Sequence, residues 1–122
     1  MMYPPFFATC YANVGVKAIF GTTPCRVYPF GEAPQRVTRP YAVFQTVTGL
    51  PENYIGQSPD MDGFTVQVDV YATTVAAARS GAEAIRDAIE GRCHITGWRG
   101  ESRDPQTNNY RYSFDCDWFV SR

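Results

Sequence analysis

The stretch FTVQVDVYA, residues 64–72, decides the fold of this chain. Its apolar side chains at every second position alternate with polar ones, which is the period of a β-strand with one buried face. In the segment that follows, residues 75–89, apolar side chains recur every three or four positions instead. Thr73 or Thr74 can cap this segment, and Gly91 is its expected end. The two periods predict a half-buried strand that leads into an amphipathic helix.

The solvent side of this helix carries two predicted ion pairs, Arg79 with Glu83 and Arg86 with Glu90, in which opposite charges lie four residues apart. Such pairs support a helix and imply no functional site.

Further strands are predicted on both sides of this unit. Residues 26–28 and 41–47 are rich in β-branched and aromatic side chains and are bounded by proline and glycine. Residues 93–98 indicate a short strand and residues 99–109 a polar loop. In the last predicted strand, residues 110–120, the even-numbered side chains share an apolar face opposite arginine, serine and aspartate.

The N-terminal segment predicts a helix, because Pro4 and Pro5 suit a first turn and apolar residues then recur at helical spacing. We expect Gly15 to end it, with at most one more turn over residues 16–20. The resulting order, α-β-β-β-α-β-β, predicts an α+β fold in which helices pack on one face of a mostly antiparallel sheet. No polar linker divides the chain, so residues 1–122 are expected to form a single domain.

The charge balance argues against a nucleic-acid or membrane partner. Eleven Lys and Arg residues face twelve Asp and Glu residues, for a net charge of −1, and the cations of segment 99–104 each have an acid nearby. No stretch approaches the roughly 20 apolar residues of a membrane span, and the N-terminus lacks the pattern of a secretory signal. We therefore expect a soluble protein made in the cytoplasm, with proteins as partners. Ten of the eleven cations are arginine, a side chain well suited to interfaces.

Metal and thiol chemistry find little support in the spacing of the cysteines. The four cysteines contain no C-x-x-C pair, and Cys93 and His94 are adjacent in a strand, so their side chains point to opposite faces. Asp115 and Asp117 share a strand face, but such acids are far more often solvated or paired with arginine than catalytic. Gly97 to Gly100 is interpreted as a turn. We predict no enzyme activity, no catalytic residue, no metal, no cofactor and four reduced thiols.

The segment between Gly49 and Gly63 is expected to be a loop of more than a dozen residues. Loops of that length usually carry a function. The candidate interface residues are Tyr54, Ile55 and Met61, because the local sequence offers no helix or strand that would bury them. The alternative is an ordered loop that folds these three side chains back onto its own domain.

Several stretches together resemble the tail completion family of long-tailed bacteriophages and prophages, to which tail terminators of the lambda type are similar. The resemblance extends in colinear order over nearly the whole chain, and none of its motifs is catalytic or metal-binding. It is carried by these segments: MYPPFF (2–7), RVYPFGEAPQ (26–35), PYAVFQ (40–45), FTVQVDVYA (64–72) with the helix after it, WRGESRD (98–104) and YRYSFDCDW (110–118).

The resemblance implies a structural protein of the virion, made in the host bacterial cytoplasm and placed at the head-proximal end of the tail. It implies a ring of six copies on the last ring of the tail tube protein, which stops tube polymerisation and offers a surface for head–neck connector proteins. Another neck component, such as a head-completion or adaptor protein, is the alternative that gene order would distinguish. A small hydrolase or a nucleic-acid-binding module would be exposed by an activity screen or a salt-dependent DNA shift.

Overall fold

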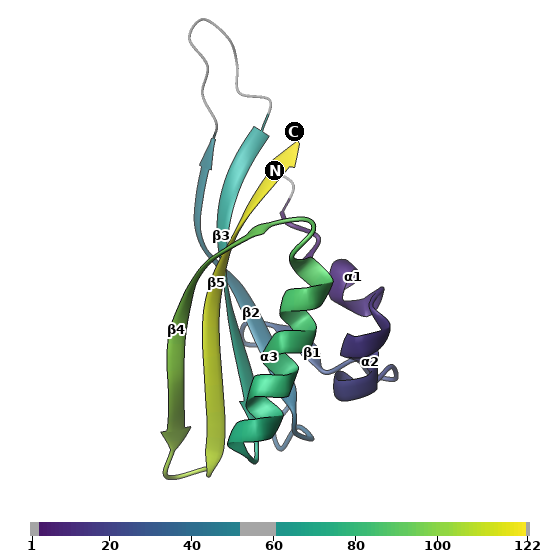
Figure 1. The fold of residues 1–122 in the computed structure, drawn as a ribbon, viewed down its shortest axis with the longest axis vertical. Coiled ribbons are helices and arrows are strands. Elements are labelled where there is room, and N and C mark those ends of the chain that lie inside the picture. The colour runs from purple at the N-terminus through teal and green to yellow at the C-terminus, as the bar shows by residue number, and fades with distance from the viewer. Residues whose placement is uncertain (1–2, 52–60, 122) are drawn as a thin grey trace, which may run out of the picture.

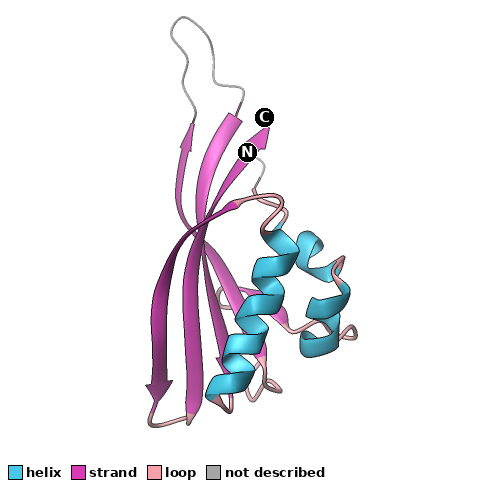
Figure 2. Cartoon of the chain, viewed as in Figure 1, coloured by secondary structure: helices cyan, strands magenta, loops and turns pink. Residues whose placement is uncertain are grey.

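The computed structural model describes residues 3–51 and 61–121, in which helices cover one face of a five-stranded sheet (Figures 1 and 2). The strands lie in the order β1-β2-β3-β5-β4; β1 runs parallel to β2, and the other neighbours are antiparallel. The α+β fold with a mostly antiparallel sheet is confirmed. In chain order the elements are α1 (Phe6–Tyr11), α2 (Val14–Phe20), β1 (Val27–Pro29), β2 (Tyr41–Pro51), β3 (Met61–Ala72), α3 (Val75–Ile89), β4 (His94–Asp104) and β5 (Asn109–Ser121).

The central pair of strands, β3 and β5, forms the floor of the core. Their register places Val68 opposite Phe114 on the helix side, and the next pair, Asp69 opposite Ser113, on the other side. Even-numbered residues of β3 are all buried, as the alternation predicted. Trp118 and Phe114 are buried in the same core cluster as the apolar stripe of α3, which confirms the predicted apolar face of the last strand.

Helix α3 packs across this floor. Two features of its sequence fix its position, a capping residue before its first turn and a glycine in its middle. The side chain of Thr74 caps it by accepting a hydrogen bond of 3.1 Å from the amide of Ala77. Gly81 faces Phe20 of α2 and Val70 of β3, and a Cβ atom at that position would lie 3.0 Å and 2.9 Å from their side chains. The missing side chain of Gly81 therefore allows α3, α2 and the sheet to meet closely.

The N-terminal helix prediction was wrong in its boundary. The chain forms two helices, α1 and α2, which are separated at Ala12 and Asn13, and Gly15 lies inside α2 instead of ending α1. Asn13 explains the break, because its side chain accepts a hydrogen bond of 3.0 Å from the amide of Val16 and so caps a new helix.

Two predicted loops are shorter than expected because their ends are strand. Segment 49–51 pairs with segment 62–64, so the loop between β2 and β3 is confined to fewer residues than 49–63. Residues 99–104 continue β4 along β5, and the turn predicted at Gly97 to Gly100 is a strand with register shifts on either side of Trp98. Residues 99–104 pair with β5 through their backbone, which a polar sequence does as well as an apolar one. In segment 49–51, Gly49 and Pro51 are residues typical of loops, and they concealed the strand.

We expect Gly81→Ala to destabilise the protein. Alanine gains about 1 kcal/mol in helix propensity, but overpacking against two fully buried side chains costs about 1–3 kcal/mol. The expected net loss in the free energy of unfolding, measured by urea denaturation, is about 1 kcal/mol. Gly91→Ala is the matched control, since a Cβ atom added there would meet no neighbouring atom within 4 Å and no loss is expected. Equal stability of the two variants would show that α3 does not need the close approach.

Candidate interaction surfaces

The molecule is elongated, and its strands run past the helices at one end (Figure 1). That end carries the junction of β2 and β3 together with the end of β5. Met61, predicted as a loop residue, begins β3 instead, pairs with Ser121 of β5 and is half-buried. Tyr54 and Ile55 lie outside the described residues. The interface prediction for these three residues is therefore untested.

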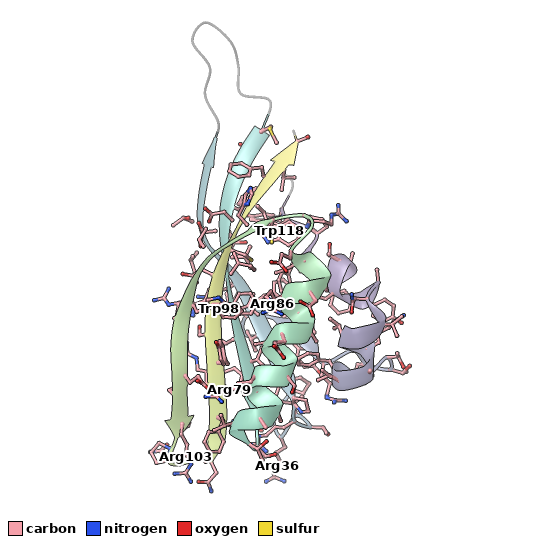
Figure 3. The ribbon with its side chains drawn as sticks, in the orientation of Figure 1. Arg36, Arg79, Arg86, Trp98, Arg103 and Trp118 are labelled. Atoms are coloured by element: carbon pink, nitrogen blue, oxygen red, sulfur yellow. The ribbon has the colours of Figure 1, made fainter. Side chains whose placement is uncertain are left out.

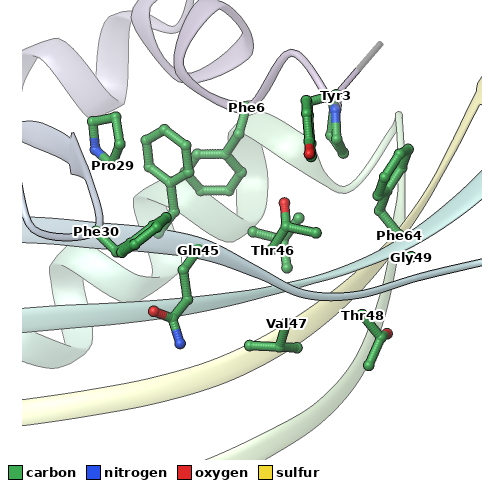
Figure 4. Close-up of a pocket in the computed structure, with 13 residues that line it drawn as sticks. Tyr3, Phe6, Pro29, Phe30, Gln45, Thr46, Val47, Thr48, Gly49 and Phe64 are labelled. Carbon is green, nitrogen blue, oxygen red and sulfur yellow. The ribbon is translucent and has the colours of Figure 1, made fainter. Parts of the chain in front are cut away.

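An apolar groove of about 580 Å³ lies beside β2 at this end (Figure 4). Phe30 and Phe64 lie at its two ends, and the Tyr3 ring packs 5.5 Å from that of Phe64. Strand β1 pairs with β2 only over residues 42–44. Beyond that point the outer edge of β2 borders the groove, without a partner strand among the described residues.

The face of the sheet opposite the helices holds a polar network around Asp69. Its carboxylate accepts hydrogen bonds from Arg111, at 2.9 Å and 3.0 Å, and from the Ser113 hydroxyl, with the Gln67 amide at 3.3 Å. Charge and hydrogen-bond capacity of Asp69 are thus used within the sheet. This arrangement stabilises the exposed face and leaves Asp69 poorly suited to act as a catalytic base.

Asp115 and Asp117 are also engaged by neighbouring strands. Arg99 of β4 lies 3.3 Å from Asp115, and the hydroxyl of Thr65 donates a hydrogen bond of 2.8 Å to Asp117. Asp115 is therefore paired with arginine, which is one of the two ordinary roles expected for acids on a strand face. Among the described residues, one carboxylate oxygen of Asp115 is buried without a partner.

A second groove, of about 420 Å³, separates α3 from β4, and we call it the tryptophan groove. Its floor is Trp98, which is 45% exposed and packs against the rings of Tyr112 and Phe114 at centroid distances of 5.4 Å and 5.0 Å. Its wall on α3 consists of Arg79, Ala82, Glu83 and Arg86. Figure 3 shows Arg79 and Arg86 on α3 beside Trp98 of β4.

The charges along this wall do not pair as the spacing in the sequence suggested. Arg79 makes a bidentate ion pair with Glu101 of β4, at 2.9 Å and 3.0 Å, and Arg86 bonds to Asp87. The predicted pairs within α3, Arg79 with Glu83 and Arg86 with Glu90, are not formed. The Glu83 carboxylate makes no ion pair or hydrogen bond with any described residue.

On the side of α3 away from β4, helices α1 and α2 expose an apolar surface, which we call the aromatic patch (Figure 1). It consists of Phe7, Tyr11, Val14 and Lys17. The rings of Phe7 and Tyr11 stack at 5.8 Å, and the Lys17 ammonium lies 5.3 Å from the centroid of the Tyr11 ring. Val14 is 79% exposed, an unusual position for a β-branched apolar side chain that begins a helix.

The cysteines lie in the core and not at any of these surfaces. All four are buried; Cys116 accepts a hydrogen bond of 3.2 Å from the Trp118 indole. Burial, reinforced by Cys25 and Cys116, raises the pKa of the Cys10 thiol to about 12, and a hydrogen bond to Cys116 together with burial raises the pKa of Cys93. Within residues 3–51 and 61–121, no three His, Cys, Asp or Glu side chains are grouped so that they could hold a metal ion. Nor is any helix of these ranges long and apolar enough to cross a membrane.

Comparisons with known proteins show which family model and which solved structure the chain resembles. A family model described as "Tail completion protein gp17" matches residues 5–121. Among solved structures, a chain from "Virion of native gene transfer agent (GTA) particle" superposes with a TM-score of 0.70 at 16% sequence identity, covering 96% of this chain and 92% of that one. The superposition shows that the two share a fold. No curated protein matches the sequence significantly.

The four cysteines are expected to be free thiols that burial shields from reagents in the native protein. A pKa near 12 leaves Cys10 with about a thousandfold less thiolate than an ordinary cysteine at neutral pH. A thiol reagent such as DTNB should therefore react slowly with the folded protein and then with four thiols in denaturant. Rapid modification of the native protein, or zinc in stoichiometric amount in a metal analysis, would contradict this expectation.

Proposed function

Since its residues 5–121 match the family model, the chain belongs to the tail completion protein gp17 family, and we propose that it terminates the tail tube of a long-tailed phage particle. In this role several copies, six by the sequence resemblance, form a ring on the last ring of tube protein. The ring stops tube polymerisation and presents the surface to which the neck of a filled head binds. The family match over almost the entire chain carries the proposal.

The shape of the subunit supports a capping role. Tube subunits add through contacts that repeat, so a cap must bind the tube at one end and differ at the other. At the end where β2 meets β3, the structure exposes Tyr3, Val47 and Phe119. The opposite end carries Arg36 and Arg103 (Figure 3). One end is therefore rich in exposed apolar side chains and the other carries cations, so the second end does not repeat the chemistry of the first.

The engagement of the candidate catalytic carboxylates is consistent with this role, because a cap needs binding surfaces and no bond chemistry. Of the two candidates, Asp115 is paired with Arg99, and Asp117 accepts a hydrogen bond from Thr65. The solved structure that shares this fold is a chain of a virion particle, which also supports a structural role. We infer a structural component that works at the head-proximal end of the tail and is not an enzyme.

Deleting the gene from its phage or prophage should separate terminator from other neck roles. Without a terminator, tube polymerisation has no stop, so electron micrographs should show tails longer than normal and heads filled with DNA but without tails. Expression of the wild-type chain in trans should restore tail length and joining. If the deletion leaves tails of normal length and the defect lies in the heads, the chain is a head-completion or adaptor protein and our assignment is wrong.

We also propose that Tyr54 and Ile55, in the segment between β2 and β3, and Met61, the first residue of β3, contact a ring neighbour or the tail tube. Pro51 and Asp62 pair across the hairpin, so replacing residues 52–61 by Asn-Gly should close it with a tight turn and leave the domain folded. The proposal predicts a folded variant, with an unchanged melting temperature within a few degrees, whose tails overgrow or fail to join heads. Normal tails joined to heads would refute a role for this segment.

A further inference from the structure

The aromatic patch and the tryptophan groove lie on opposite flanks of the subunit. Figure 1 shows α1 and α2 at one side of α3, and β4 at the other. Helix α3 presents Gly81 to α2 and its Arg79, Glu83 and Arg86 stripe to β4. A surface on one flank and a different surface on the other flank cannot meet within one chain, but they can meet between neighbours that are related by rotation.

The helix layer leaves room for such a neighbour. Helices α1, α2 and α3 cover the sheet from β1 to β5, and next to β4 the layer ends in the tryptophan groove. The partly exposed Trp98 is held there by the rings of Tyr112 and Phe114. A fixed tryptophan between arginine side chains is the type of residue that dominates protein interfaces.

The two surfaces carry complementary charges. Lys17 is the only lysine of the chain, and the first acidic residue in the sequence is Glu32, so α1 and α2 carry a positive charge with no acid of their own. On the groove wall, Arg79 and Arg86 are occupied by Glu101 and Asp87, whereas Glu83 makes no ion pair with a described residue. The free charge of the patch is thus positive and that of the groove wall is negative.

We propose that the aromatic patch of one copy docks in the tryptophan groove of the next, with Lys17 paired to Glu83 of the neighbouring copy. The contact is heterologous, so its repetition closes a ring when the rotation between neighbours is a whole fraction of a full turn and there is no translation along the axis. Stacked Phe7 and Tyr11 cover Trp98 and complete the helix layer over β4. This inference rests on the proposed ring of the terminator and names the flanks that form it, while the two ends stay available for tube and neck.

Zero-length crosslinking of isolated particles tests the contact directly. A carbodiimide joins amines to carboxylates, and Lys17 is the only side-chain amine of the protein. The expected product is a dimer and higher multimers, in which peptide mass spectrometry finds Lys17 of one copy joined to Glu83 of another. Multimers joined without Lys17, or Lys17 joined to an acid of the tube or a neck protein, would overturn the proposed pairing of patch and groove.

Charge reversal gives an independent test in the complemented deletion strain. Because the contact repeats around the ring, Lys17→Glu or Glu83→Lys alone should lower the yield of complete particles by about tenfold or more, and the double reversal should restore most of it. Both positions are exposed or half-exposed, so each purified variant should keep the wild-type melting temperature. Glu90→Lys, an equal change just after the same helix and outside the groove lining, is the matched control and should have no effect.

Different results would reject the proposed interface and the terminator role. If wild type controls tail length but the single reversals assemble normally, the ring uses other flanks and only the interface proposal is lost. A third variant, Trp98→Ala, should be folded and defective in the same assay, because the groove loses its floor. A chain that is absent from particles and without effect on tail length would reject the terminator role itself.

Discussion

The register between β3 and β5 is the constraint on which the rest of the structure depends. Side chains alternate across a sheet, so placing Val68 opposite Phe114 also fixes Asp69 opposite Ser113 on the other face. A slip of one residue on β3 would turn Asp69 into the core and Val68 into water. Burial of valine and phenylalanine on one side and the Asp69 network with Arg111 on the other therefore favour the same register.

The sequence predicted the helices and strands that bury one apolar face, because burial makes apolar residues recur with a regular period. It did not predict the segments that lack such a face. The alternation of β3 and the stripe of α3 were visible because each has one apolar face. Residues 99–104 are strand as well, yet all six are exposed, so no buried face produces alternation there. The break before α2 depends on a local cap by Asn13, which the helical spacing of apolar residues on both sides concealed.

The candidate surfaces were likewise predicted from the sequence only in part. The predicted interface residues were chosen from loop length, and the structure places Met61 in a strand while Tyr54 and Ile55 lie outside the described residues. The tryptophan groove was missed because it forms only where α3 packs beside β4, and no period in the sequence indicates that packing. Arg79, Glu83 and Arg86 were visible as one helical stripe. Their interpretation as pairs within α3 overlooked Glu101, which only the fold brings to Arg79.

An elongated subunit with unlike flanks and unlike ends suits a cap that binds its own copies sideways and different proteins above and below. Cryo-electron microscopy of the junction between head and tail is the most direct test of the proposed cap. We expect one ring of this chain between the last ring of the tail tube and the neck, with the subunits side by side and their ends toward the two partners. Density for this chain in the head shell, along the tube or at the distal tip of the tail would contradict it.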